Sequence, residues 1–271
     1  MINISTDFFT ADINVNHFPD KTINFKLNIE DIIEKSQDLP LTIHWHYEND
    51  SELFILYSLV NMIRDYDPTV DIILDLPYLP NARMDRIKHN DEVFTLKYFA
   101  KLINGMNFKY VYMCDVHSNV GLALIDRVIE MYPKFAVQSA IIQSNTETLY
   151  FPDEGSVKRY ADKFDKPFVF GMKKRDWETG KILGLDVLGN TDLIKGKDIL
   201  IVDDICSRGG TFYHSAKKLK ELGANKIYLF VTHCENTILD SELLTSGLIE
   251  KVYTTNSIFT AQHEKIEVFE I

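Results

Sequence analysis

Short apolar runs rich in β-branched residues alternate with stretches of helical periodicity along most of the chain. In the first half, after strand-like pieces within residues 2–27, the runs predict strands and the periodic stretches predict amphipathic helices. These strands are expected at residues 41–47, 70–78 and 108–117, and the helices at residues 53–63 and 94–103. Because strands alternate with helices, we expect right-handed βαβ units and a parallel sheet.

The second half restarts the same alternation. Its strands are expected at either 140–143 or 148–151, then at 167–172, 184–188, 199–202, 226–232, 251–255 and 266–271, with a short helix at 157–164. Residues 173–180 are too polar for a core and are expected to form a mobile loop. The predicted fold class is α/β, with two domains, 1–135 and 136–271, and a cleft between them.

Residues 199–212 carry the most informative chemistry. An apolar run leads into the adjacent carboxylates Asp203 and Asp204, then into a small-residue loop at 207–211, and then into a helix that stops at Gly223. A loop between a strand's carboxyl end and a helix's amino end offers free N–H groups and the helix dipole to an anion, and its glycines let a phosphate come close. The carboxylates can accept hydrogen bonds from vicinal sugar hydroxyls.

Each part of this stretch has an ordinary alternative. A strand–Gly–Gly–helix junction is common in α/β proteins, and an Asp-Asp pair can simply cap a turn. The full order of apolar run, acid pair, small loop and threonine is far more specific. It predicts a site for a ribose phosphate.

Composition narrows the class of protein. The chain has 271 residues, a net charge of −11 and three widely spaced cysteines, Cys114, Cys206 and Cys234. The acidic balance disfavours nucleic acid as a general partner, and the unpaired cysteine pattern favours a reducing compartment. The amino terminus does not resemble a signal peptide, and no apolar run approaches the length of a membrane span. We therefore expect a cytoplasmic protein with no membrane partner.

The 199–212 stretch resembles the 5-phosphoribosyl-diphosphate (PRPP) loop that type I phosphoribosyltransferases share with PRPP synthetases. An ordered set of further motifs favours the synthetases (ribose-phosphate diphosphokinases), and the resemblance covers nearly the whole chain. These motifs are Phe18-Pro19-Asp20, Asn49-Asp50, residues 77–86, Asp115-Val116-His117-Ser118, residues 152–159, Lys173-Lys174-Arg175, Thr232-His233 and Thr255-Asn256. The resemblance implies two phosphoribosyltransferase-like domains, the first binding ATP and the second binding ribose phosphate.

The resemblance further implies an activity, which is transfer of the β,γ-diphosphate of ATP, with Mg²⁺, to the anomeric hydroxyl of ribose 5-phosphate, releasing AMP. It assigns catalysis to Lys173 and Arg175, ATP binding to Phe18, Asp20, Arg83, Asp85, Arg86 and His117, and metal binding to His117 and Asp153. It assigns ribose-phosphate binding to Asp203, Asp204, Cys206, Ser207, Arg208, Gly209, Gly210 and Thr211. Cations suit a reaction that spreads charge over phosphoryl oxygens, and Mg²⁺ prefers oxygen ligands such as Asp153.

Phe18 and Asp20 match the family segment that reaches the adenine site of a neighbouring subunit. This implies a shared active site and a homo-oligomer, minimally a dimer. An aromatic ring could stack on the base, and a carboxylate could accept from its exocyclic amine. Taken without the family, the two residues could equally form an ordinary hairpin edge.

Three departures from the family pattern stand out. Lys21-Thr22 replaces Gly-Glu, Met84 replaces a glutamine, and Ser207-Arg208 replaces Asp-Thr in the PRPP loop. The last change moves the loop's charge by two units toward positive and removes a hydroxyl. It suits a larger anionic substituent, so ADP-ribose, converted to ADP-ribose diphosphate for NAD synthesis, is an alternative acceptor. A type I phosphoribosyltransferase and a non-catalytic regulatory homologue remain further alternatives.

Overall fold

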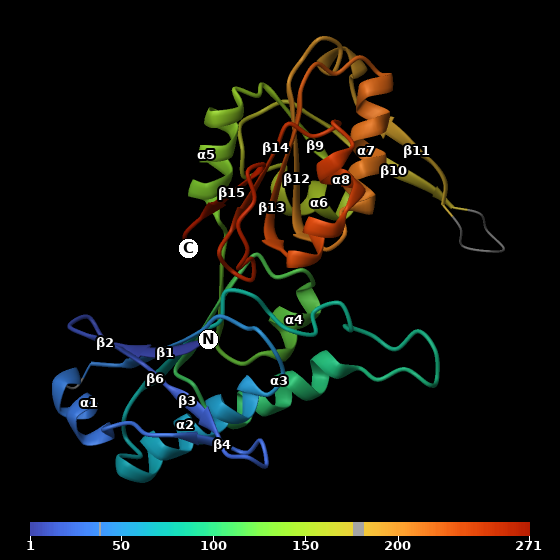
Figure 1. Ribbon diagram of the computed structural model, residues 1–271. Helices are drawn as coiled ribbons and strands as arrows, with labels where there is room; N and C mark the ends of the chain where they lie inside the picture. Colours follow the sequence, from blue (N-terminus) through green and yellow to red (C-terminus); the bar gives the residue numbers. More distant parts are fainter. Residues whose placement is uncertain (38, 176–181) are drawn as a thin grey trace. The chain divides into compact units, whose positions relative to one another are not determined.

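The computed structural model describes residues 1–37, 39–175 and 182–271, with the backbone only for residues 173–175 and 182–184. It divides into two compact units, Met1–Tyr132 (unit 1) and Pro133–Ile271 (unit 2). Each unit contains a mainly parallel sheet flanked by helices (Figure 1), which confirms the predicted α/β class.

Unit 1 is built on a sheet in the order β2-β1-β5-β6-β7-β8. Its strands are β1 (Ile2–Ser5), β2 (Thr10–Asp12), β5 (Leu41–Trp45), β6 (Ile72–Asp75), β7 (Tyr110–Cys114) and β8 (Val128–Met131). Strands β5 to β8 run parallel, whereas β1 pairs antiparallel with β2 and β5. A separate antiparallel hairpin joins β3 (Val15–His17) to β4 (Ile23–Phe25).

The helices of unit 1 follow from apolar side chains at helical spacing. They are α1 (Ile29–Ser36), α2 (Glu52–Tyr66), α3 (Thr95–Gly105) and α4 (Asn119–Leu124). In α2, Leu56, Leu59 and Ile63 are fully buried and share one apolar cluster with Ile43 and Trp45 of β5. The alternation along β5 therefore directs its buried side chains onto these helices.

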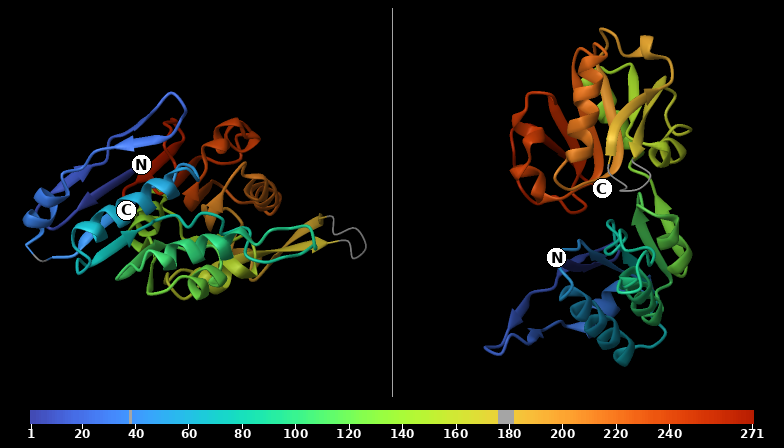
Figure 2. Two further views of the ribbon diagram at one scale, coloured as in Figure 1. Left: turned by 90° about the horizontal axis from the view of Figure 1, so that it is seen from below. Right: turned by 90° about the vertical axis from the view of Figure 1, so that its right-hand side faces the viewer.

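Unit 2 is built on a sheet in the order β11-β10-β9-β12-β13-β14-β15. Its strands are β9 (Thr148–Phe151), β10 (Phe168–Arg175), β11 (Ile182–Leu188), β12 (Ile199–Cys206), β13 (Ile227–Cys234), β14 (Lys251–Thr255) and β15 (Ile266–Phe269). All neighbours are parallel except β10 and β11. The β10–β11 pair extends away from the rest of its sheet in Figure 1 and in the left view of Figure 2.

The run at 199–202 is apolar throughout because both faces of this sheet are covered. Ile199 and Ile201 belong to one apolar cluster with α7 (Gly210–Glu221), while Leu200 and Val202 belong to another with α5 (Lys134–Ser144) and α6 (Glu154–Tyr160). All four side chains are completely buried. The remaining helices are η1 (Thr191–Leu193), η2 (Asn236–Asp240) and α8 (Glu242–Thr245).

Of the two alternatives for one strand, 148–151 is confirmed as β9, whereas residues 140–143 belong to α5. Two other expectations were wrong in detail. Residues 173–175 are not loop, because antiparallel pairing of β10 with β11 continues through them. The remainder of the expected mobile loop, 176–180, lies outside the described residues. Strand β12 does not end before the acid pair but runs through it to Cys206.

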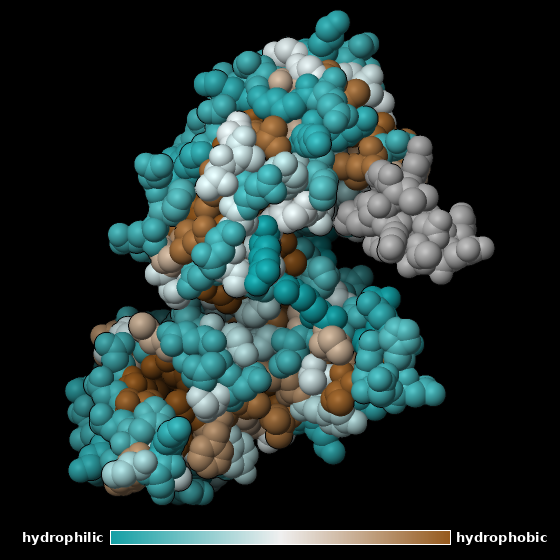
Figure 3. All heavy atoms as spheres, turned by 45° about the vertical axis from the view of Figure 1, so that its right-hand side comes forward, coloured by the Kyte–Doolittle hydropathy of each residue, from teal (hydrophilic) through white to brown (hydrophobic). Residues whose placement is uncertain are grey.

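Large apolar side chains also reach the surface of unit 1. Phe54 and Tyr57 on α2, and Tyr98 and Leu102 on α3, are at least half exposed. Figure 3 shows brown side chains interrupting the hydrophilic surface in the lower part of the view. Among the described residues, no helix has both the length and the apolar character needed to cross a bilayer.

Candidate active site

The acids of unit 2 lie at a switch in strand order. From β9 the chain continues to β10 on one side, whereas β12, on the other side of β9, leads to β13. Ligands of open α/β sheets bind outside the carboxyl ends of strands at such a switch point. Asp153 follows β9, and Asp203 and Asp204 stand near the carboxyl end of β12.

The loop after β12 has the geometry of an anion site. It spans Ser207 to Gly209, and α7 begins at Gly210. Gly209 adopts φ +69°, and a Cβ atom built on it would lie 2.7 Å from Cδ2 of Leu243. Only glycine fits this position without strain, and it lets the loop pack directly against α8. The N–H groups at the amino end of α7 can then face an anion.

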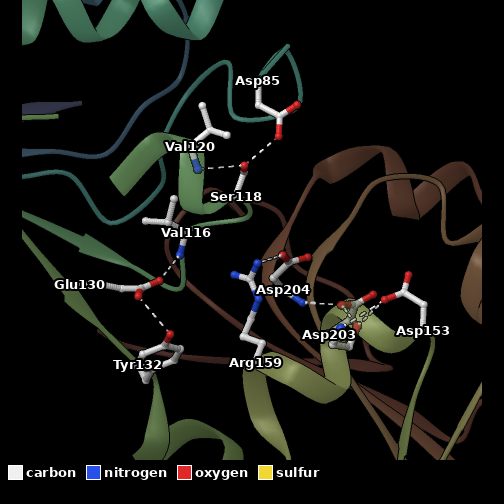
Figure 4. A network of polar contacts seen from close by, with 11 residues as sticks. Asp85, Val116, Ser118, Val120, Glu130, Tyr132, Asp153, Arg159, Asp203 and Asp204 are labelled. Carbon is white, nitrogen blue, oxygen red and sulfur yellow. Dashed lines mark hydrogen bonds and ion pairs between the residues drawn. The ribbon is translucent and has the colours of Figure 1, made fainter. Parts of the chain in front are cut away.

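The two acids of β12 have different partners, drawn in Figure 4. Arg159 of α6 forms an ion pair with Asp204 at 3.3 Å between Nη2 and Oδ2, and both side chains are largely buried. Asp203 accepts a hydrogen bond from the Ser156 hydroxyl at 2.7 Å. Burial, followed by the charges of Asp204 and Asp153, raises the pKa of Asp203 to about 7. Asp204 is thus paired with a cation. Asp203 instead lies next to two other carboxylates, whose negative charge disfavours its ionised form.

Asp153 is the N-cap of α6 and not the end of a strand. Its Oδ1 accepts from the backbone N–H of Ser156 at 3.2 Å, and the Ser156 hydroxyl that donates to Asp203 lies 3.3 Å from the same oxygen. Ser156 therefore connects Asp153 with Asp203. A cluster of carboxylates that raises the pKa of one member suits a divalent cation with oxygen ligands, because the cation would offset the repulsion.

The remaining loop residues fall into buried and exposed sets. Cys206 is 1% exposed, and its register partner is Cys234 of β13. A hydrogen bond with Cys234 and burial raise the pKa of the Cys206 thiol, so this side chain is a core group and any binding role rests on its backbone. Ser207 Oγ lies 3.2 Å from Thr237 Oγ1, whereas Arg208 is exposed. Thr211 lies in the first turn of α7.

In unit 1, two loops meet at the carboxyl ends of β6 and β7. Asp85 is buried and accepts hydrogen bonds from Arg86 Nε at 2.7 Å and from the Ser118 hydroxyl at 2.7 Å. The Arg86 hydrogen bond, with that of Ser118, lowers the pKa of Asp85 to about 2. Arg83 and Arg86 expose their side chains on this loop. The structure therefore joins Asp85 to the loop that carries His117.

His117 itself is exposed and lies after the end of β7, not within the strand. Asp115 turns the chain with φ +45°, and Ser118 caps α4 by accepting from the N–H of Val120 at 3.2 Å. Among the described residues no group of three or more His, Cys, Asp or Glu side chains is arranged to hold a metal ion. Mg²⁺ is commonly held by one or two protein carboxylates together with substrate phosphates, so Asp153 fits such a site.

Phe18 and Asp20 lie on the turn of the β3–β4 hairpin, and Phe18 is 53% exposed. Asp20 accepts from both the N–H and the hydroxyl of Thr22, at 3.0 and 2.7 Å. The Thr22 hydroxyl, and then its N–H, lower the pKa of Asp20. Threonine at position 22 thus occupies one oxygen of the carboxylate.

The backbones of Lys173 and Arg175 lie in β10, opposite Leu185 and Ile182 of β11. Their side chains lie outside the described part of the chain. Sequence reasoning did not single out Ser156, Arg159, Ser118 or Glu130 as contributors to the sites. The sequence could have pointed to Ser156 and Arg159. They follow Asp153 by three and six residues, a spacing that places both on one face of a short helix.

Comparison with known proteins identifies relatives of this chain. Residues 183–271 match the family described as "Phosphoribosyl synthetase-associated domain". The chain is 30% identical over 225 residues to ribose-phosphate pyrophosphokinase 2, chloroplastic, of rice, covering 80% of this chain. It is 26% identical over 264 residues to ribose-phosphate pyrophosphokinase 1 of Listeria monocytogenes, covering 95% of this chain and 80% of the relative.

The chain is similar to the PRPP synthetase family.

A PRPP synthetase from Mycobacterium smegmatis has the same fold, with a TM-score of 0.74, 17% identity, and coverage of 96% of this chain and 86% of that one. The chain spans about half the length of the rice relative, 54%. The predicted relationship to PRPP synthetases is therefore confirmed, and what this chain itself catalyses is taken up under the proposed function.

The ion pair between Asp85 and Arg86 predicts a contribution to stability that depends on pH. The folded pKa of Asp85 is about 2, below the ordinary value, so its stabilisation is present above about pH 4 and is lost as pH falls toward 2. Because Arg86 is exposed, we expect Asp85→Asn to lower the free energy of unfolding of unit 1 by only about 1–2 kcal/mol at pH 7.

Trp45 fluorescence during urea unfolding, in a Trp177→Phe background, measures this effect because Trp45 is buried in unit 1. The difference in stability between the Asp85→Asn variant and its parent should vanish between pH 4 and pH 2. A difference of equal size at both ends of that range would contradict the prediction.

Proposed function

We propose that this protein transfers the β,γ-diphosphate of ATP to the anomeric hydroxyl of ribose 5-phosphate, giving PRPP and AMP. In this step the C1 hydroxyl oxygen attacks Pβ, the bond between Pβ and the α,β-bridging oxygen breaks, AMP leaves with that oxygen, and the hydroxyl proton is released. The observation that carries the proposal is the acid pair of β12, followed two residues later by a glycine-containing loop at the amino end of α7. Similarity to the PRPP synthetase family supports it.

Each part of the unit 2 site has a role in this proposal. The N–H groups at the amino end of α7 hold the 5-phosphate, and the glycine at 209 allows that approach. Asp203 and Asp204 accept hydrogen bonds from the ribose 2- and 3-hydroxyls. The ion pair with Arg159 fixes the Asp204 carboxylate, which preserves its acceptor geometry.

The loops of unit 1 hold ATP in this proposal. Arg83 and Arg86 are exposed cations suited to phosphate contacts, and Asp85 fixes Arg86 through a bidentate pair with Nε and Nη2. His117 lies beside this loop through Ser118. Phe18 and Asp20 contact adenine, in a neighbouring subunit as in the family.

Lys173 and Arg175 are proposed as the catalytic cations, because phosphoryl transfer depends on positive charge near the transferred group. Asp153 and His117 are the proposed residues for Mg²⁺. The ion would neutralise phosphate charge when bound. Asp153 would supply a carboxylate oxygen, the ligand type that Mg²⁺ prefers, and the substrate phosphates would supply further oxygens.

Arg208 supports a second candidate acceptor, ADP-ribose, whose product would be ADP-ribose diphosphate for NAD synthesis. The guanidinium is exposed in the loop that would hold the 5-substituent, and the neighbouring Ser207 hydroxyl already contacts Thr237. A diphosphate offers a guanidinium more anionic oxygens than a monophosphate does.

Steady-state assays with ATP, Mg²⁺ and each acceptor distinguish the candidates. Ribose 5-phosphate turnover with none from ADP-ribose supports PRPP synthesis, and the reverse supports the second candidate. In the second case, Arg208→Thr should lower kcat/KM for ADP-ribose about tenfold, the cost of one charged hydrogen bond. Product from PRPP and a base without ATP would instead indicate a phosphoribosyltransferase.

We also propose a homo-oligomer and a cytoplasmic location, as the sequence predicts. Exposed apolar side chains such as Phe54, Tyr57, Tyr98 and Leu102 support self-association, since monomers rarely expose large apolar patches. Sedimentation velocity over a range of concentrations tests it, and a monomer at micromolar concentration would contradict it.

A further inference from the structure

The backbone before His117 is held by a carboxylate from the neighbouring strand. The parallel ladder pairs Met113 with Glu130, and the N–H of Asp115 continues it by donating to the Met131 carbonyl at 2.8 Å. At the next N–H the acceptor changes. Val116 donates to Oε1 of Glu130 at 3.1 Å, so the side chain of Glu130 binds the backbone just beyond the end of β7.

A second hydrogen bond fixes the Glu130 carboxylate. The Tyr132 hydroxyl donates to Oε2 of Glu130 at 3.0 Å, and Figure 4 shows Glu130 between Val116 and Tyr132. With one oxygen bound to Tyr132 and the other to Val116, the carboxylate has a defined orientation. Tyr132 is the last residue of unit 1.

The backbone after His117 is anchored from the other loop. The Ser118 hydroxyl donates to Asp85 Oδ2 at 2.7 Å and accepts from the N–H of Val120 at 3.2 Å. Val116, on the other side, is 2% exposed. The exposed His117 therefore stands between two neighbours that are each fixed by a charged acceptor.

These hydrogen bonds hold a turn whose backbone conformation is unfavourable. Asp115 adopts φ +45°, a left-handed conformation that costs an L-residue free energy and persists only where its surroundings hold it. A hydrogen bond to a carboxylate is stronger than one to a neutral carbonyl, so Glu130 is well suited to hold the turn. Removing it would leave the N–H of Val116 without this acceptor and free the turn to relax.

We propose that Glu130 is a positioning residue for His117 in the ATP site, with Tyr132 orienting the Glu130 carboxylate. The proposal rests on the proposed function for the role of His117. Glu130 does not contact the substrates in this account. It acts through the main chain of the His117 loop, and loss of such a supporting partner commonly lowers site affinity or activity about 10–100-fold.

Two variants test it with two independent readouts. Glu130→Ala removes both hydrogen bonds, whereas Glu130→Gln keeps an oxygen for the Val116 N–H and an NH₂ group for the Tyr132 oxygen. Asp71→Ala is the matched control, because Asp71 is an exposed carboxylate of unit 1 paired with Lys109. Amide hydrogen exchange at Val116 reports the turn, and calorimetric titration with a non-hydrolysable ATP analogue and Mg²⁺ reports the site.

We expect Glu130→Ala to exchange the Val116 amide about tenfold faster and to bind the analogue about tenfold more weakly. Glu130→Gln and Asp71→Ala should stay within about threefold of wild type, and the KM for the acceptor should be unchanged in all three, within the same tolerance. Tyr132→Phe should fall between Ala and Gln at position 130.

Wild-type exchange and wild-type affinity in Glu130→Ala would overturn the proposal, and so would equal losses in the Ala and Gln variants. A wild-type protein that binds no ATP analogue overturns the proposed function instead. In that case the Val116 exchange still decides whether Glu130 holds the turn.

Discussion

Replacing Arg159 with alanine is expected to destabilise unit 2 by about 3 kcal/mol, because it leaves a buried carboxylate without its cation. Asp204 is 4% exposed, and its ion pair with Arg159 has side chains exposed by only 6% and 17%. Lys158→Ala on the same helix is the matched control. Its pair with Glu154 has both side chains about three-quarters exposed, so the change should stay within about 0.5 kcal/mol.

Urea unfolding followed by far-UV circular dichroism measures the loss in unit 2, while Trp45 fluorescence in a Trp177→Phe background should show unit 1 unchanged. Adding Asp204→Asn to Arg159→Ala should recover part of the loss, because the buried negative charge is then removed. Equal stability of the Arg159→Ala and Lys158→Ala proteins would contradict the assignment of a buried pair.

Gly209→Ala is expected to abolish most activity, with kcat/KM falling about a hundredfold or more, since small displacements of a positioned group carry costs of this size. The new methyl group would require φ +69° of an L-residue and would meet Leu243 at 2.7 Å. Gly210→Ala is the matched change. Among the described residues, apart from its chain neighbours and its own helix backbone, no atom lies within 4 Å of a Cβ at that position, and no left-handed conformation is required there.

Both glycine variants are compared by urea unfolding and by steady-state kinetics. Gly209→Ala should lower the free energy of unfolding by about 1–2 kcal/mol, whereas Gly210→Ala should leave it unchanged. Any loss of activity in Gly210→Ala would then reflect the approach of a phosphate to the loop and not a folding defect. Unfolding curves that coincide for the two variants would contradict the geometry assigned to Gly209.

The strand–loop–helix junction at 199–212 could be predicted because its signals are local. A run buried on both faces, an acid pair, a glycine at positive φ and a helix with periodic apolar residues all lie within one stretch of chain. The exact end of β12 could not be predicted. Pairing with β13, Asp203 opposite Val231 and Cys206 opposite Cys234, extends the strand through two carboxylates of low strand propensity.

At residues 173–175, too, pairing with a neighbouring strand decides the structure against the local composition. Its composition predicts a loop, but backbone pairing with β11 makes it a strand. Likewise, residues 140–143, three of them apolar, fit either element by composition. The helical spacing of the buried Ala136, Val137, Ala140 and Ile141 places them within α5.

The hydrogen-bond partners of the site residues could not be predicted because they are far apart in the sequence. Glu130 reaches Val116 across fourteen positions, and Ser156 reaches Asp203 across forty-seven. These contacts depend on which strands are neighbours, namely β7 with β8 and β9 with β12. A pattern along the chain predicts the elements, whereas the supporting hydrogen bonds depend on how the sheet is ordered.

The fate of the phosphates tests the central proposal most directly. ATP labelled separately at Pβ and Pγ is incubated with ribose 5-phosphate or ADP-ribose and Mg²⁺, and the products are separated. Transfer of both labels together to C1 of the sugar, with AMP formed in equal amount, is the predicted result. Transfer of Pγ alone with release of ADP, or no dependence on ATP, would contradict it.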